Sequence, residues 1–142
     1  MVESKKQDQA GFSGSERILF VDDDVSVAAP VGEMLSQFGY DVETSTNPNH
    51  ALTAFRDDPH RFDLLITDMT MPDLTGDDLA REVIRIRPDM PVIICTGFNR
   101  RIDDFNADAM GVKGLITKPF TIKDVAKTVR EVLDRREDRV DS

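Results

Sequence analysis

Short apolar runs alternate with longer segments of helical period along most of this chain, and this alternation constrains the fold more than any other feature. Five runs rich in branched residues lie at positions 18–21, 41–45, 62–67, 91–96 and 115–117, of which 41–45 is the least apolar. Apolar runs of this length are typical of parallel strands that are buried on both faces. The sequence therefore predicts a parallel sheet covered by helices.

The segments between the runs carry apolar residues three and four positions apart, which is the spacing of an amphipathic helix. These residues lie within positions 27–38, 52–55, 79–86, 102–109 and 122–132. Asn47 followed by Pro48 favours a helix start, and Gly39 is typical of the residue just after a helix end. Thr121 with Asp124 resembles a capping box. Each apolar run is thus followed by one predicted helix.

Five strand–helix units joined by right-handed crossovers form an open α/β sheet. We expect a flavodoxin-like (βα)5 doubly wound parallel sheet with strand order 2-1-3-4-5. A chain of 142 residues fits one domain, which we place at residues 17–134. The polar segment 1–16, which contains glycine and serine, is predicted to be a disordered leader, and 135–142 a charged tail.

Net charge and hydropathy exclude several classes of function. The formal charge of −9 argues against direct nucleic-acid binding, because such binding needs Lys and Arg to neutralise phosphates. Nowhere does the sequence carry a run of about 18 apolar residues, so we expect no membrane insertion and a cytoplasmic protein. The single cysteine, Cys95, has isoleucine neighbours and is predicted to be a core residue.

Polar residues stand at the ends of four apolar runs. Asp22 and Asp23 follow the first run, Asp68 follows the third, Thr96 ends the fourth, and Lys118 follows the fifth. Ligands of open α/β sheets bind at the carboxyl ends of the strands, so we expect these side chains to form one acidic pocket with one cation. Each residue alone would be an ordinary turn or cap residue, and Asp24 fits a helix N-cap best. Their joint placement indicates a functional site.

Three carboxylates that converge at this edge repel one another, by about 4 kcal/mol for a pair roughly 4 Å apart at an effective dielectric constant near 20. Hard oxygen ligands with incomplete coordination by protein favour Mg²⁺, with Mn²⁺ as an alternative, and such a cation can share a phosphate oxygen. Together with Lys118, the cation balances the three carboxylates. Asp68, alone on its strand, is then the candidate nucleophile for an aspartyl phosphate.

The motifs at these positions resemble those of the receiver-domain family of response regulators. They are VDDD at 21–24, DMTMPDLTG at 68–76, TG at 96–97 and KPF at 118–120, and the resemblance covers residues 17–134. It implies that the metal ligands are Asp22, Asp23, Asp68 and the backbone carbonyl of Thr70, that Asp68 is phosphorylated, and that Thr96 and Lys118 contact the phosphoryl group.

The resemblance also implies a phospho-acceptor in a two-component phosphorelay rather than an enzyme with a separate substrate. The phosphoryl group would come from a sensor histidine kinase or a histidine phosphotransfer domain, by Mg²⁺-dependent transfer to Asp68. Phosphorylation would then switch binding to an unknown downstream protein. Leu115 departs from the family pattern, which has Tyr or Phe at that position, so we expect a smaller conformational switch.

Two other functions remain open at this point. The sequence Asp22-x-Asp24 after a hydrophobic strand also resembles the signature of haloacid-dehalogenase phosphatases, in which the first Asp is the nucleophile. That hypothesis leaves Asp68 and the Met71-Pro72 turn without a role. The second alternative is a degenerate receiver that serves only as an interaction module.

Overall fold

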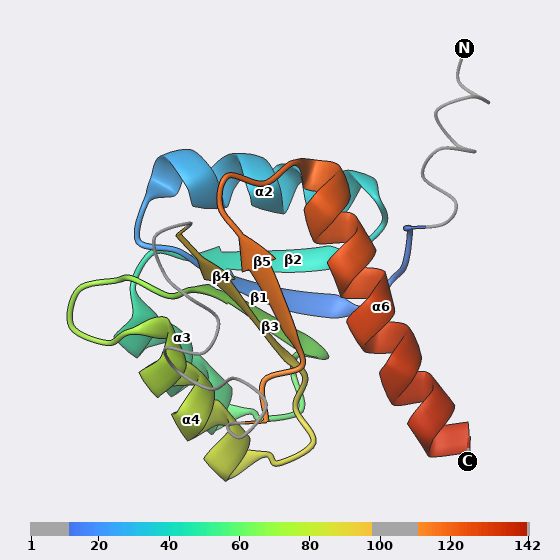
Figure 1. Ribbon diagram of the computed structural model, residues 1–142. Helices are drawn as coiled ribbons and strands as arrows, with labels where there is room; N and C mark the ends of the chain where they lie inside the picture. The colour runs from blue at the N-terminus through green and yellow to red at the C-terminus, as the bar shows by residue number, and fades with distance from the viewer. Residues whose placement is uncertain (1–11, 98–110, 142) are drawn as a thin grey trace.

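The computed structural model describes residues 12–97 and 111–141, and within them the chain forms a five-stranded parallel sheet (Figure 1). Its strands are β1 (Arg17–Val21), β2 (Asp41–Ser45), β3 (Leu64–Asp68), β4 (Val92–Thr96) and β5 (Gly114–Thr117). They are arranged in the order β2-β1-β3-β4-β5, with every neighbouring pair parallel. The predicted fold class and strand order are confirmed.

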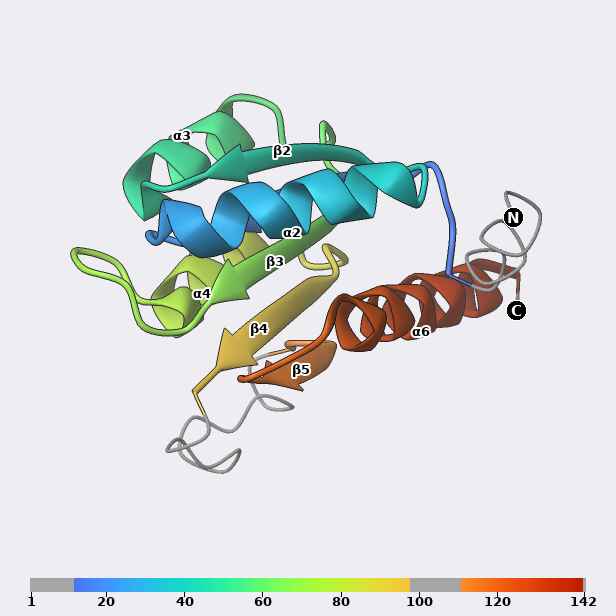
Figure 2. The same ribbon diagram turned by 90° about the horizontal axis from the view of Figure 1, so that it is seen from above.

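Helices cover both faces of the sheet. Figures 1 and 2 show α2 (Val25–Gln37) and α6 (Ile122–Asp141) on one side, and α3 (Pro48–Asp57) and α4 (Gly76–Ile86) on the other. Successive strand residues point to opposite faces, so the central strands β1, β3 and β4 supply both layers of the core. Leu19 and Leu65 pack toward α3 and α4, whereas Ile18 and Ile66 pack toward α2 and α6. The apolar runs of β1, β3 and β4 are therefore strands buried on both faces, whereas the outer strands β2 and β5 are more exposed.

The predicted helix ends are largely those of the structure. The Asn47 side chain accepts hydrogen bonds from the backbone at the start of α3, and Gly39, with φ of 103°, follows the end of α2. Thr121 and Asp124 form the reciprocal capping box, with bonds of 3.0 and 3.1 Å. α6 continues to Asp141, through the segment predicted as a charged tail. The helix predicted at 102–109 lies outside the described residues.

The start of β3 differs from the prediction, which placed it at Phe62. The strand begins at Leu64, whose partner across the ladder is Ile18. Just before it, the Asp63 carboxylate accepts a hydrogen bond from the backbone N–H of Arg17 at 2.9 Å. The Asp63 side chain thus takes the place of a backbone ladder bond at this end of the sheet. Phe62 is buried, but it is not part of the strand.

Residues 12–16, which the sequence places in a disordered leader, are instead bonded to the domain; we call them the N-terminal clasp. Arg130 of α6 forms a two-pronged ion pair with Glu16, with N–O distances of 3.0 and 3.2 Å. The Tyr40 hydroxyl donates to the carbonyl of Phe12 at 2.8 Å, and the Gly14 N–H donates to the carbonyl of Phe38 at 3.1 Å. The clasp therefore joins the start of β1 to α6.

Removing the Arg130 guanidinium, which binds the clasp through Glu16, should destabilise the fold. Arg130→Met keeps the aliphatic part of the side chain but leaves Glu16 without its partner, so we expect the free energy of unfolding to fall by about 2 kcal/mol in urea denaturation. Arg81→Met serves as the control, because Arg81 is 59% exposed in its ion pair with Asp78 and should contribute less than about 0.5 kcal/mol. Equal denaturation midpoints for the two variants would contradict a structural role of the clasp.

Candidate functional site

The parallel sheet places the polar strand ends together at one edge. Asp68 ends β3 and Thr96 ends β4, and the register of the β3–β4 pair sets Asp68 opposite Cys95. Asp22 follows β1 directly, and Lys118 follows β5. Neighbouring parallel strands end at the same edge, so four segments that are distant in sequence supply one site, as the sequence predicts.

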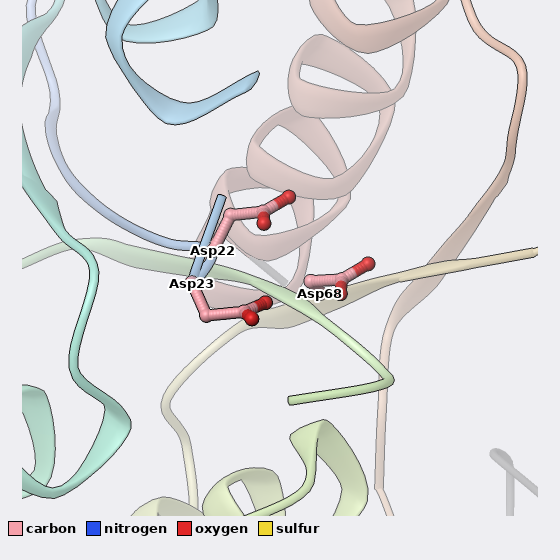
Figure 3. A group of neighbouring side chains, drawn as sticks. All are labelled: Asp22, Asp23 and Asp68. Atoms are coloured by element: carbon pink, nitrogen blue, oxygen red, sulfur yellow. The ribbon is translucent and has the colours of Figure 1, made fainter. Parts of the chain in front are cut away.

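Three carboxylates meet at this edge. One oxygen from each of Asp22, Asp23 and Asp68 can be chosen so that all three lie within 4.8 Å of one another. Figure 3 shows the three carboxyl groups side by side at the ends of β1 and β3. Asp22 and Asp68 are buried, whereas Asp23 is exposed. Clustered carboxylate oxygens, partly open to solvent, are a donor set that suits a hard divalent cation that keeps some of its water.

Lys118 supplies a positive charge next to this cluster. Its ammonium group lies 2.7 Å from a carboxylate oxygen of Asp68 and 3.5 Å from one of Asp22. Burial alone would lower the pKa of Lys118, but the hydrogen bond to Asp68 and the two nearby negative charges outweigh it and raise the pKa. Lys118 is therefore a cation at neutral pH, and it offsets part of the repulsion among the carboxylates.

Asp22 is more deeply buried than Asp23, the other carboxylate that follows β1. Its Oδ1 accepts a hydrogen bond from the backbone N–H of Asp24 at 2.9 Å. Burial raises the pKa of Asp22, and the neighbouring Asp68 charge adds to that, while the Asp24 bond and Lys118 act against it. The pKa of Asp22 is thus higher in the folded protein than in the unfolded chain. Protonation of Asp22 therefore favours folding at pH values below its pKa in the unfolded chain, and this contribution is lost as the pH rises through its pKa in the folded protein.

Asp24 acts as the helix cap that its sequence position suggests. Its Oδ1 accepts hydrogen bonds from the backbone N–H of Ser26 at 2.9 Å and from the Ser26 hydroxyl at 2.6 Å. These bonds lower the pKa of Asp24, so its carboxylate stays ionised at the positive end of the α2 dipole. The cap also fixes the turn whose N–H holds Asp22, so the start of α2 and the acidic cluster are built from the same few residues.

The backbone that follows Asp68 packs closely against the start of α4. A Cβ added to Gly76 would overlap the carbonyl oxygen of Asp68 and lie 2.8 Å from the Cα of Met69. The Gly76 N–H donates to the Met69 carbonyl at 2.8 Å. Glycine at this position is therefore a packing requirement of the strand end that carries Asp68.

The remaining predicted residues differ in their exposure to solvent. Thr96 is buried at the end of β4, and its carbonyl accepts the N–H of Lys118 at 2.7 Å. Thr70, two positions after Asp68, is exposed. Leu115, on β5, is partly buried and packs against the core cluster of the α3–α4 face. Cys95 is a buried core residue as predicted, and burial raises its pKa to about 12.

Comparison with known proteins decides the family. Residues 18–130 match the model of the response regulator receiver domain. The chain belongs to this family. The phosphatase alternative is therefore not favoured. Among the described residues, no helix combines the length and the apolar character that a membrane span requires.

Individual relatives differ in how much of them this receiver domain covers. The response regulator receiver protein CpdR of Brucella abortus is 30% identical over 118 residues, which are 83% of this chain and 97% of that protein. The sensor kinase CckA of the same organism is 29% identical over 95% of this chain but only 14% of the kinase. The chain also spans half the length of the probable transcriptional regulator ycf27 of Pyropia yezoensis, at 33% identity.

Solved structures agree with the fold of this receiver domain. The crystal structure of a response regulator receiver domain protein from Clostridium thermocellum superposes with a TM-score of 0.80 at 30% identity, covering 86% of this chain and 97% of that one. A CheY-like receiver from Methanospirillum hungatei JF-1 gives 0.80 at 28% identity, covering 89% and 99%. The arrangement of strands and helices is thus that of known receivers.

A methyl group at position 76 should disturb the strand end that carries Asp68. Gly76→Ala would force the Asp68 and Met69 backbone to move, so we expect the free energy of unfolding to fall by about 2 kcal/mol in chemical denaturation. Gly97→Ala is the matched control, because a Cβ there meets no atom within 4 Å and should change stability by less than about 0.5 kcal/mol. If the two variants were equally stable, the close approach of Gly76 to Asp68 would not be a constraint.

Proposed function

We propose that this receiver domain accepts a phosphoryl group on Asp68 from a phosphohistidine, with Mg²⁺ or Mn²⁺ bound by the acidic cluster. The observation that carries the proposal is the position of Asp68, which shares the cluster with Asp22 and Asp23 and lies 2.7 Å from Lys118. An oxygen nucleophile between a divalent site and a lysine is what phosphoryl transfer needs, because its catalysis is mostly positioning and charge neutralisation.

In the proposed reaction, a carboxylate oxygen of Asp68 attacks the phosphorus atom. A new oxygen–phosphorus bond forms while the bond from phosphorus to the histidine nitrogen breaks, and that nitrogen leaves with the electron pair and takes up a proton. The divalent cation would be held by Asp22, Asp23, Asp68 and the backbone carbonyl of Thr70, and it would neutralise phosphoryl oxygens. Asp68 thereby becomes an aspartyl phosphate.

Lys118 and Thr96 would contact the transferred group. The Lys118 ammonium already lies beside the nucleophilic carboxylate, so it can follow the negative charge onto a phosphoryl oxygen. Thr96 ends the neighbouring strand, and its hydroxyl can donate a hydrogen bond to another oxygen. These interactions exist only in the phosphorylated state, so they can shift the conformational equilibrium. Because position 115 carries leucine instead of an aromatic residue, we expect only a modest conformational change around β5 and α6.

The proposed role is that of a signalling phospho-acceptor and not of an enzyme with a separate substrate. The donor would be a sensor histidine kinase or a histidine phosphotransfer domain, and the output would be altered binding to a downstream protein. The phosphatase alternative, with Asp22 as nucleophile and Asp24 as acid or base, conflicts with the hydrogen bonds of both residues. Asp24 caps α2, and Asp22 is buried between the Asp24 N–H and Lys118.

Phosphorylation should require Asp68 and no other carboxylate of the cluster as acceptor. With acetyl phosphate or a phosphohistidine donor and Mg²⁺, we expect one phosphoryl group on the wild-type protein and none on Asp68→Asn, as measured by intact mass. Asp73→Asn, in the exposed loop that follows, is the control and should be labelled normally. Label that persists on Asp68→Asn and disappears with Asp22→Asn would instead support the phosphatase-like reaction; no label on the wild type would support an interaction-only module.

Divalent cations should stabilise the folded protein by binding it and not the unfolded chain. At a Mg²⁺ concentration of about 100 times Kd, the free energy of unfolding should rise by about 2.7 kcal/mol, which is readily measured as an increase in melting temperature. Asp23→Ala should remove most of this increase, because it removes one of the three carboxylates of the cluster. Asp23 is exposed, so the substitution should leave the packing of the core unchanged. A melting temperature that is indifferent to millimolar Mg²⁺ in both proteins would rule out the metal role.

A further inference from the structure

Thr67 places a hydroxyl inside a fully buried strand of the sheet. β3 has the sequence LLITD, and all five of its residues are buried. Thr67 itself is 0% exposed and comes directly before Asp68. A buried hydroxyl carries a desolvation penalty unless it is hydrogen-bonded, whereas valine would fill nearly the same space without that penalty. The position therefore calls for an explanation beyond packing.

The hydroxyl of Thr67 is bonded to the backbone of the proposed nucleophile. It donates to the carbonyl oxygen of Asp68 at 3.0 Å. This is the same oxygen that a Cβ on Gly76 would overlap. The amide on the other side of that peptide, the Met69 N–H, donates to the Cys95 carbonyl at 2.9 Å. Both polar atoms of the peptide that follows Asp68 are therefore held, one of them by Thr67.

We propose that Thr67 is a positioning residue for phosphoryl transfer to Asp68. Rotation of the peptide after Asp68 turns the Asp68 side chain relative to the chain that follows, because it changes the torsion about the Cα–C bond of Asp68. The hydrogen bond from Thr67 restrains that rotation. Thr67 does not touch the phosphoryl group, and it acts through the direction in which Asp68 presents its oxygen to Lys118 and the metal site. The inference rests on the proposed function of Asp68.

Two matched pairs of variants separate the hydroxyl from the volume of the side chain. Thr67 and Thr67→Val differ in a hydroxyl against a methyl group, and Thr67→Ser and Thr67→Ala differ in a hydroxyl against a hydrogen. The second pair keeps the test valid if the valine variant folds poorly. Thr53→Val is the control for a threonine hydroxyl that bonds to a backbone carbonyl far from the site, that of Asn49 at 3.0 Å on the exposed face of α3.

The readout is the rate constant of labelling by acetyl phosphate at saturating Mg²⁺, measured below the melting temperature of each variant. In both pairs we expect the member without the hydroxyl to react about tenfold more slowly, because misplacement of a reacting group slows transfer. Thr67→Ser should remain close to the wild type even if its melting temperature falls. Thr53→Val should react at the wild-type rate.

Two results would overturn the inference. One is equal rates within each pair, which would leave Thr67 with a packing role. The other is a loss of rate that follows the melting temperatures across all four proteins, with serine as slow as alanine. Failure of the proposed function is recognised separately, because the wild type would then take up no label, or Asp68→Asn would still be labelled.

Discussion

The contact of Lys118 with Asp68, at 2.7 Å, is the interaction on which the carboxylate cluster of this receiver domain depends. Asp22 and Asp68 are both buried, and Asp23 lies beside them, so their charges repel one another at close range. Lys118 offsets part of that repulsion and leaves room for a divalent cation to offset more. If the proposed cation binds here, it would offset more of this repulsion and so stabilise the folded protein.

The backbone prepares this edge before any ligand arrives. The Asp24 turn holds Asp22 through an N–H, and the absence of a side chain at Gly76 lets α4 approach the carbonyl of Asp68. The Lys118 N–H bonds to the carbonyl of Thr96, which ties the end of β5 to that of β4. Such fixed donors and charges would need little rearrangement during the proposed transfer, and preorganisation of this kind is the main physical source of catalysis in phosphoryl transfer.

The sequence was sufficient for the fold and for the residues at the strand ends because those signals are local. Apolar runs predict the strands, and parallel strands necessarily gather Asp22, Asp68 and Lys118 at one edge. The Glu16–Arg130 ion pair could not be predicted, since its partners are 114 positions apart and each is an ordinary surface residue by sequence. The hydrogen bond of Thr67 was missed for another reason: threonine is common in strands, and only the structure shows where its hydroxyl points.

A crystal structure of the protein with Mn²⁺, in which the anomalous signal locates the ion, tests most directly whether these carboxylates bind a divalent cation next to Asp68, as proposed. We expect one strong peak in contact with carboxylate oxygens of Asp22, Asp23 and Asp68, with Lys118 still beside Asp68. A map without a peak at this edge at millimolar Mn²⁺, or with its peak at a different carboxylate group, would contradict it.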